Sequence, residues 1–434
     1  MKKISLLFLL LALISVSVAQ DSTRVFTLDE CVRSAIENSP QAAQIRAQQN
    51  QTLTGILTSL SPVLPYVSLS SRWNRSGPQA ASIVDVPGGE PIITQEPFAD
   101  NVQASVSVVQ NLLDLASFAQ IGQIPQIDNL ASEQYLQSIA DLAFQVKEQY
   151  YNLIVLYNNL SVSDAALEQI RQQAEIAREQ FRLGVIARPE LLRVEVALLQ
   201  RQVERVNALA ALVNGRRALA NLIGSDYPVR IDTSVSFPDT LKPLPPPEVF
   251  NKLVLERNPS YLISATNLKL QETAETVSKL RIVPSVNGSF TYGYSSPDWF
   301  TQWQDNDFWQ LGVELSWSIF ERLSWYAQVR EASAQTQIVK ANVDITRNNV
   351  ILQMNQAYAS LVAAREALVL VPQLLEQANE EQRLTGEQFR LGAASSLDFL
   401  QSQLTFIQAQ QQAVQVLVNY HLAQAQIQQL LGEW

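Results

Sequence analysis

The chain is poor in the residues from which catalytic and metal sites are usually built. Among its 434 residues are one cysteine, one histidine and 14 glycines. A single cysteine excludes a disulfide within the chain, and one cysteine with one histidine cannot form a zinc site of familiar spacing. The sequence also lacks a glycine-rich phosphate loop. We therefore expect no enzyme, no metal and no cofactor, and interpret the scattered acidic residues as solvated helix faces.

Positive charge is scarce as well. The chain has 31 Lys and Arg against 41 Asp and Glu, a net charge of −10, which argues against a nucleic-acid partner. Beyond the N-terminal segment we identify no apolar stretch of the roughly 20 residues that a transmembrane helix needs. An exported chain without such a helix is either soluble or inserted in a membrane as a β-barrel.

The N-terminus has the features of an export signal. Lys2 and Lys3 precede an apolar run over residues 4–16, and Ser17-Val18-Ala19 supplies the small residues of a cleavage site. We predict a signal peptide over residues 1–19; a membrane anchor is disfavoured because the apolar run is short. Cys31 follows Asp29-Glu30 rather than apolar and small residues, so we expect it to carry no lipid.

The remaining chain is duplicated. Glu179-Gln180-Phe181-Arg182-Leu183-Gly184 returns unchanged as Glu387-Gln388-Phe389-Arg390-Leu391-Gly392, 208 positions later (387 minus 179). Leu64-Pro65 returns as Val283-Pro284 in the same order. An internal repeat constrains the whole architecture. We predict one structural repeat over residues 20–240 and a second over 241–434, the first with a longer loop between Trp73 and Asn101.

Long helices are predicted in both repeats. Residues 126–183 contain neither Gly nor Pro and are rich in helix-forming residues. The following segment carries an apolar stripe at spacings of three and four, made of Val196, Leu199, Val203, Val206, Ala210 and Val213. The matching positions of the second repeat are Leu404, Ile407, Gln411, Val414, Val418 and His421. Helices of this length must pack side by side as antiparallel coiled coils.

Each repeat also contains two predicted strands, near residues 66–74 and 101–110 in the first and 285–295 and 308–318 in the second. Apolar and small polar residues alternate along them, as in a transmembrane barrel or in a soluble sheet with one packed face. The tryptophans favour the membrane, because six of the seven lie in or beside the strands: Trp73, Trp299, Trp303, Trp309, Trp317 and Trp325. Four strands cannot close a barrel, so several chains must share one.

With these features the chain resembles the TolC-like outer-membrane efflux proteins. Phe26-Thr27-Leu28-Asp29-Glu30 followed by Asn38-Ser39-Pro40, the two strand-entry prolines, and the two Phe-Arg-Leu-Gly segments are similar to that family's motifs. The resemblance implies an α+β membrane protein whose trimer shares a 12-stranded β-barrel above an α-barrel of long helices. It also implies an exit duct of the outer membrane, with its helices in the periplasm.

By the same resemblance, the duct would serve a tripartite efflux pump or a type I secretion system. Its partners would be a periplasmic adaptor and, through the adaptor, an inner-membrane pump. The alternative we weighed is an exported coiled-coil structural protein or adhesin. That class explains the long helices, but not two strand pairs at matched positions of a duplicated chain.

The resemblance places the functional residues at two helix-hairpin tips, near residues 184–190 and 392–398. The expected docking residues are Arg182, Leu183, Gly184, Arg390, Leu391 and Gly392. The expected constriction residues are Glu190, Phe389, Asp398 and Gln401. Here the sequence departs from the family, since Phe389, Ala394 and Gln401 replace a gating Tyr, a gating Arg and a ring Asp.

The closed tip is therefore expected to rest on apolar contacts of Phe389, Leu391 and Phe399. Arg182 and Arg390 are expected to pair with Glu190 and Asp398.

Overall fold

A computed structural model describes residues 25–77, 82–84, 92–94, 99–234, 243–296, 307–320, 322–391 and 393–434. The predicted signal peptide lies outside these residues. The chain forms two compact units. The first, which we call the helix unit, comprises Met1–Gln49, Ser132–Ile263 and Asp344–Trp434. The second, the strand unit, comprises Asn50–Ala131 and Ser264–Val343, so each unit takes segments from both sequence repeats.

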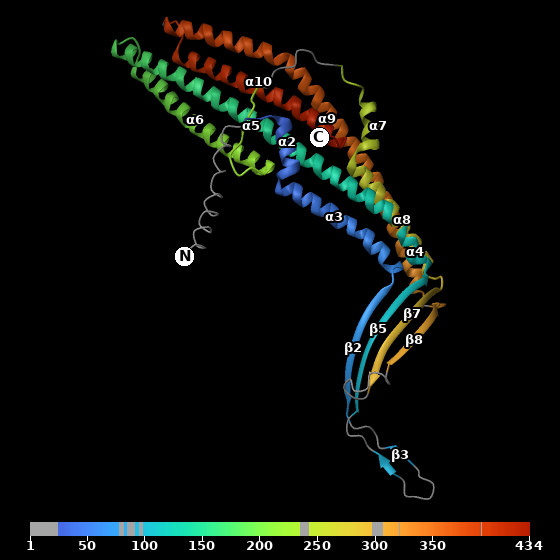
Figure 1. Ribbon diagram of the computed structural model, residues 1–434. Helices are drawn as coiled ribbons and strands as arrows, with labels where there is room; N and C mark the ends of the chain where they lie inside the picture. Colours follow the sequence, from blue (N-terminus) through green and yellow to red (C-terminus); the bar gives the residue numbers. More distant parts are fainter. Residues whose placement is uncertain are drawn as a thin grey trace, which may run out of the picture. The chain divides into compact units, whose positions relative to one another are not determined.

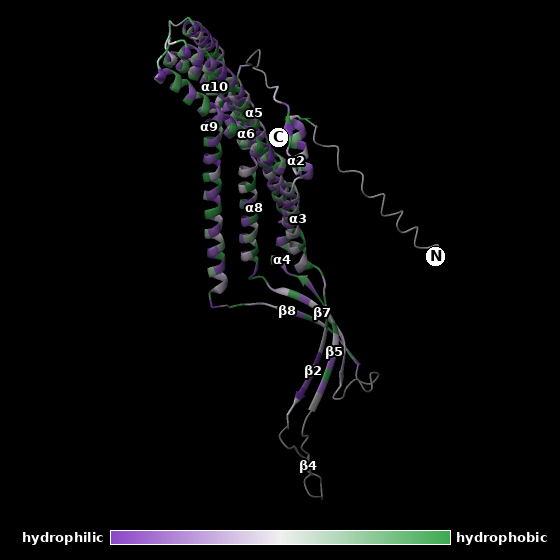
Figure 2. Ribbon diagram, turned by 90° about the vertical axis from the view of Figure 1, so that its left-hand side faces the viewer, coloured by the Kyte–Doolittle hydropathy of each residue, from purple (hydrophilic) through white to green (hydrophobic). Residues whose placement is uncertain are grey.

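Two long antiparallel hairpins dominate the helix unit and run side by side (Figure 1). The first consists of α5 (Ile124–Arg182) and α6 (Arg188–Ile223), and the second of α9 (Ser324–Arg390) and α10 (Ser396–Leu430). Hydrophobic and hydrophilic residues are interspersed along these helices (Figure 2). The remaining elements are β1 (Val25–Phe26), α2 (Leu28–Asn38), β6 (Arg230–Ile231), α7 (Pro247–Arg257) and the first part of α3 (Pro40–Leu60) and of α8 (Pro259–Leu280).

In each repeat, a side-chain hydrogen bond joins a short element to the end of a helix hairpin. In the first repeat, the Ser34 hydroxyl donates to the Ile223 carbonyl at 3.1 Å. In the second, the Asn258 amide donates to the Leu430 carbonyl at 2.8 Å. The first repeat adds a parallel pairing of β1 with β6, and the Tyr150 hydroxyl donates to the Asp232 carbonyl at 2.8 Å. These contacts fix the ends of α6 and α10 at equivalent places.

The strand unit contains one four-stranded antiparallel sheet with the order β2-β5-β7-β8. Its strands are β2 (Tyr66–Ser76), β5 (Ala99–Leu113), β7 (Ser285–Ser296) and β8 (Asp307–Ser316). Each repeat supplies one hairpin, and β5 pairs with β7 to join the two. The outer strands β2 and β8 carry the two edges of the sheet. A short helix, η1 (Ser61–Val63), precedes β2, and α4 (Leu115–Ile121) follows β5.

The strand register separates an apolar face from a small polar face. Leu69, Val106, Tyr292 and Trp309 form one row across all four strands. Their side chains stay exposed, by 78%, 42%, 42% and 69%. On the opposite face, Ser107 and Thr291 share a hydrogen bond of 3.0 Å between their hydroxyls. Val102 and Tyr294, at one end of the same face, are buried, but this row across the middle of the sheet is exposed, unlike the packed face of a soluble sheet.

The polar face departs from the alternation at Tyr66, Val109 and Phe308. A Cβ on Gly293 would lie 2.9 Å from the Phe308 ring and 2.8 Å from the Ser105 Cβ. Glycine at this position therefore makes room for the aromatic ring to lie across the neighbouring strand.

Three sequence expectations change in the structure. Strands β2, β5 and β7 run up to three residues past their expected ends, whereas β8 ends two residues before its expected end. A bulge between Asn111 and Leu113 shifts the register of β5 against β7. The loop after β2 contains a further small pairing of β3 (Ser82–Val84) with β4 (Ile92–Thr94). The expectation of no second apolar stretch of spanning length is wrong, because α9 contains an 18-residue window with a mean hydropathy of 1.3. Arg365 and Glu366 interrupt the apolar residues there.

Gly224 ends α6 in a conformation that other residues avoid. Its φ is +72°, and an added Cβ would lie 2.7 Å from the Asn38 carbonyl oxygen. Gly184 also has a positive φ, +76°, but open space lies around its Cβ position. Alanine at either position incurs about 1–2 kcal/mol of backbone strain. Only Gly224→Ala adds a collision with the backbone.

We therefore predict that Gly224→Ala lowers the thermal midpoint of the helical circular dichroism signal clearly more than Gly184→Ala does. Both variants should be measured in the same detergent and at the same protein concentration. Equal midpoints would show that the contact between α6 and the end of α2 relaxes without loss of stability.

Candidate functional site

The tip of the first hairpin is a short turn with standard helix-end chemistry. Gly184 closes α5 in the left-handed region, and its amide donates to the Phe181 carbonyl at 3.0 Å. Pro189 stands in the first turn of α6, where its missing N–H leaves no donor unsatisfied. Leu183 and Val185 project from this turn with 64% and 68% of their surface exposed. The tip therefore presents apolar side chains to its surroundings.

The tip of the second hairpin is closed by a capping box. The Ser395 hydroxyl accepts from the Asp398 amide at 3.2 Å, and the Asp398 carboxylate accepts from the Ser395 amide, also at 3.2 Å. This is the capping-box arrangement of a helix N-terminus. The Asp398 side chain is therefore engaged at the start of its own helix, although Asp398 remains exposed. Gly392, the expected counterpart of Gly184, lies outside the described residues.

Phe389 and Phe399 pack the second tip from inside. Their rings stack with centroids 5.3 Å apart and planes 19° apart, and their exposed fractions are 7% and 4%. Gly386 lies against the Phe399 ring, since its Cβ position is 3.4 Å from that ring. The expected apolar contact of these two rings is present, whereas Leu391 is 84% exposed and takes no part in it.

The expected ion pairs of the tip arginines are wrong within the chain. Arg182 pairs with Glu179 on its own helix. Glu190 pairs instead with Arg193, at 2.9 Å. Arg390 makes no ion pair among the described residues. The physical reason is proximity: residues three apart on a helix face the same side, so Arg182 and Glu190 each find a partner within their own turn.

A contact between the two tips was missed by the sequence analysis. The Ser396 hydroxyl donates to the Glu190 carboxylate, which joins the first turn of α10 to the first turn of α6. Beneath it, Leu400 packs on a cluster of buried apolar residues of the first hairpin, made of Leu167, Ile170, Ala174, Ala177 and Val194. The repeat pattern marked both tips but did not say that they meet. Gln401, the remaining expected constriction residue, is exposed beside this contact.

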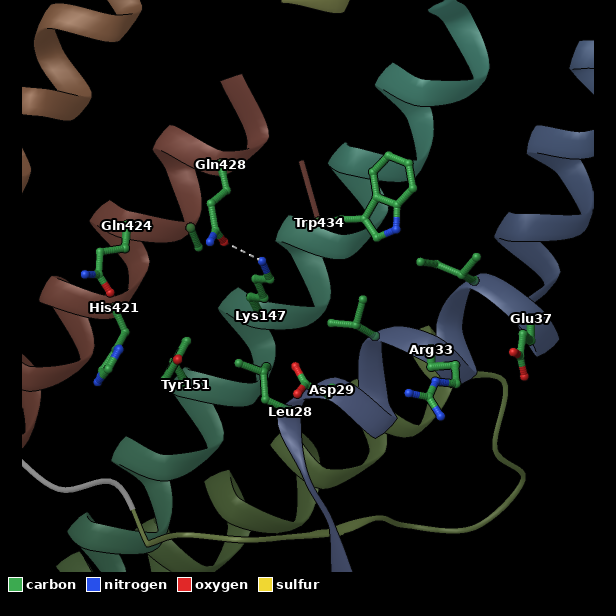
Figure 3. Close-up of a pocket in the computed structure, with 13 residues that line it drawn as sticks. Leu28, Asp29, Arg33, Glu37, Lys147, Tyr151, His421, Gln424, Gln428 and Trp434 are labelled. Carbon is green, nitrogen blue, oxygen red and sulfur yellow. Dashed lines mark hydrogen bonds between the residues drawn. The ribbon is translucent and has the colours of Figure 1, made fainter. Parts of the chain in front are cut away.

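The helix unit also contains a cavity of about 610 Å³. Figure 3 shows Lys147 directed into it from α5, donating to the Gln428 side chain at 2.8 Å. Burial lowers the pKa of Lys147, and the charge of Asp29 partly opposes that shift. Burial also lowers the pKa of His421, whose ring stacks on Tyr151 with centroids 5.2 Å apart. The cavity walls thus mix apolar, neutral polar and charged groups.

The thiol of Cys31 is poorly placed to act as a nucleophile. Burial raises the pKa of the Cys31 thiol to about 12, and the charge of Glu30 adds to this shift. A thiol of such pKa stays protonated at neutral pH and is a weak nucleophile. In the part of the chain that the structure describes, no group of three His, Cys, Asp or Glu residues is placed to hold a metal ion.

Two long helix hairpins, together with a four-stranded sheet whose central apolar residues are exposed, are typical of membrane-associated proteins built from both helices and strands. Comparison with known sequences identifies the family within that class. The profile described as "Outer membrane efflux protein" matches residues 31–225 and 252–433. The chain belongs to this family, which confirms the resemblance drawn from the sequence, and it is a protein of the outer membrane.

One curated relative is the outer membrane protein TolC of Vibrio cholerae. It is 23% identical to this chain over 227 residues, which cover 52% of this chain. The matched segment is 48% of the relative, so the chain spans about half the length of that protein.

Solved structures share the fold over almost the whole chain. The Campylobacter jejuni CmeC outer membrane channel has a TM-score of 0.79 at 17% identity, covering 93% of this chain and 85% of that one. VceC from Vibrio cholerae has a TM-score of 0.76 at 16% identity, covering 94% and 96%. The open state of the Neisseria gonorrhoeae MtrE channel has 0.74 at 16%, covering 94% and 89%.

The stacked phenylalanines lead to a prediction for the second tip. Replacing a buried Phe by Ala costs about 3–5 kcal/mol in a protein core, so Phe399→Ala should let the tip open locally far more often. We expect trypsin to cleave after the exposed Arg390 at least roughly tenfold faster in Phe399→Ala under native conditions. Timed digestion with mass spectrometry measures this rate.

Leu397→Ala is the matched control, since Leu397 lies in the same helical turn but is 59% exposed. Its cleavage rate should equal that of the parent chain. Equal rates for all three proteins would mean that the phenylalanine stack does not hold the tip closed.

Proposed function

We propose that the chain forms an outer-membrane exit duct, which carries substrates from the periplasm or an inner-membrane pump to the cell exterior. The observation that supports this most is the sheet: four strands with an exposed apolar face on one side and small polar residues on the other. That pattern suits lipid outside and water inside. Membership of the outer membrane efflux family agrees with it.

The sheet by itself cannot be the finished barrel. Its outer strands, β2 and β8, leave backbone N–H and C=O groups without partners in a lone chain, and hydrocarbon offers none. About eight strands are the minimum for a closed barrel, and more are needed for an open lumen. Three copies of a four-stranded sheet give twelve strands, so we propose a homotrimer in which β8 of one protomer pairs with β2 of the next.

The helices support assembly independently. The apolar stripe of α6 lies exposed in the single chain, with Val196, Leu199, Val203 and Val206 between 53% and 62% exposed. Val369 and Leu370 on α9 are similarly exposed, at 60% and 64%. Contiguous apolar rows on long helices are the usual seam of a coiled coil. We propose that neighbouring protomers cover these rows and close an α-barrel.

The tips take the remaining roles. We propose that Arg182, Leu183, Gly184, Arg390, Leu391 and Gly392 meet a periplasmic adaptor, through which an inner-membrane pump of an efflux or type I secretion system connects. Leu183 and Leu391 are largely exposed, as an apolar docking contact requires. We propose further that Glu190, Phe389, Asp398 and Gln401 shape the constriction. Phe389 would act by packing, and the two carboxylates and Gln401 would act from the surface.

The exposed stripe of α6 leads to a prediction about assembly. Val203→Glu places a charge in the proposed seam of every protomer and should convert the trimer into smaller species, because a buried unpaired charge is costly. Gln202→Glu makes the same residue one position away, outside the stripe, and should keep the trimer. Native mass spectrometry of the detergent-solubilised protein gives the stoichiometry. A stable monomer or dimer of the parent chain would refute the proposed homotrimer.

The two faces of the sheet predict opposite effects of one charge. Val313 lies on the apolar face and is 71% exposed, so Val313→Lys costs about 2–4 kcal/mol if it faces the bilayer midplane. Gln310→Lys, on the other face of the same strand, would point into water. We expect much less Val313→Lys than Gln310→Lys protein in the outer-membrane fraction, measured by quantitative blotting. Similar amounts of the two variants would show that the apolar face of the sheet does not face the lipid.

A further inference from the structure

A small cavity lies in the strand unit where β8 ends and α9 begins. Its volume is about 280 Å³, and its walls are mainly apolar, from Ile282, Ile319, Phe320, Leu323 and Tyr326. Three of these side chains are also strongly exposed: Ile319 by 76%, Phe320 by 79% and Leu323 by 70%. Such a concentration of exposed apolar surface requires a cover.

The cavity continues the apolar face of the sheet. Trp309, Leu311, Val313 and Leu315 follow one another along that face of β8, and Trp317 extends the row beyond the strand. The Trp317 indole N–H donates to the Ile282 carbonyl at 3.1 Å, which fixes the ring at the rim of the cavity. Tryptophan and tyrosine at such a position are typical of the level where hydrocarbon meets headgroups.

Two arginines lie at or near the cavity. Arg281 lines it, and its guanidinium donates a long hydrogen bond of 3.5 Å to the Gln328 side chain. Arg330 lies over the Tyr326 ring, 5.9 Å from its centroid. Among the described residues that line the cavity there is no carboxylate. By contrast, the nearby Lys279 is already paired with Glu275 at 2.7 Å.

The two repeats differ in the residues beside the cavity. Gln110 and Trp317 occupy matching positions, as do Asn111 and Ser318. The Gln110 amide donates to the Val63 carbonyl at 2.8 Å, the counterpart of the bond from Trp317 to Ile282. The Asn111 amide donates to the Pro62 carbonyl at 2.6 Å. Ser318 is shorter than Asn111, and it lines open space beside Arg281, the counterpart of Pro62.

We propose that this cavity binds one acyl chain of a membrane phospholipid, whose phosphate is held by Arg281. The apolar walls and the exposed side chains around them suit the hydrocarbon chain. A guanidinium without an ion-pair partner suits the phosphate, which it binds through paired hydrogen bonds. The site belongs to the second repeat, where serine replaces the amide of the first. The proposal rests on the proposed insertion of the sheet into the membrane.

The experiment uses the full-length assembled protein in nanodiscs that contain phosphatidylglycerol with a photoactivatable diazirine on one acyl chain. After irradiation, mass spectrometry maps the labelled residues. We expect strong labelling of Phe320, Leu323 and Tyr326, above that of the open apolar face at Leu311 and Val313. Arg281→Gln should reduce the cavity labelling several-fold. Ser318→Asn, which copies the first repeat, should remove most of it.

Lys279→Gln is the matched control, because it removes a neighbouring cation that is already paired, and it should leave the labelling unchanged. Gel mobility of the unheated oligomer shows whether each variant assembles. Equal labelling of the cavity and the open face, unaffected by the variants, would overturn the site. Labelling of Leu311 and Val313 but not of the cavity residues would also overturn the site, and would indicate that a neighbouring protomer covers the cavity. Absence of label from both would instead refute insertion of the sheet.

Discussion

The backbone of the two outer strands sets the constraint on which the rest of the proposed assembly depends. A strand edge carries a row of N–H and C=O groups, and in hydrocarbon each group without a partner costs several kcal/mol. A four-stranded sheet has two such edges, here β2 and β8. Closure with other copies satisfies both at once. The rows of exposed apolar residues on α6 and α9 then follow the same symmetry, because each must meet a neighbouring helix.

Duplication explains how one chain builds this architecture. Each repeat supplies one strand hairpin and one helix hairpin, and the two compact units each combine segments of both. Equivalent positions then diverge in detail. Gly224 and Gly432 end α6 and α10 in the same left-handed conformation. At the strand-to-helix joints, however, an amide pair in the first repeat corresponds to an indole and a serine in the second. In the second repeat, that serine lines a cavity.

The hairpin tips show how helix chemistry competes with function for the same side chains. Asp398 caps α10, Glu190 binds Ser396 and Arg193, and Arg182 pairs with Glu179. These exposed pairs are individually weak, each about 0–1 kcal/mol. The buried stack of Phe389 on Phe399 is the larger local contribution, because aromatic surface is removed from water.

The sequence by itself determined the long helices, the four strands of the sheet and their order. Period-two alternation located the strands, the absence of Gly and Pro located α5, and the repeated Phe-Arg-Leu-Gly segments marked the tips, because these signals act within short stretches of chain. Tertiary structure alone decided which tip residues meet. The contact of Glu190 with Ser396 spans 206 positions (396 minus 190), and the bulge at Asn111 depends on the register of β5 against β7. A local sequence pattern carries no information about contacts between residues so far apart in the chain, since these contacts form only when separate elements pack.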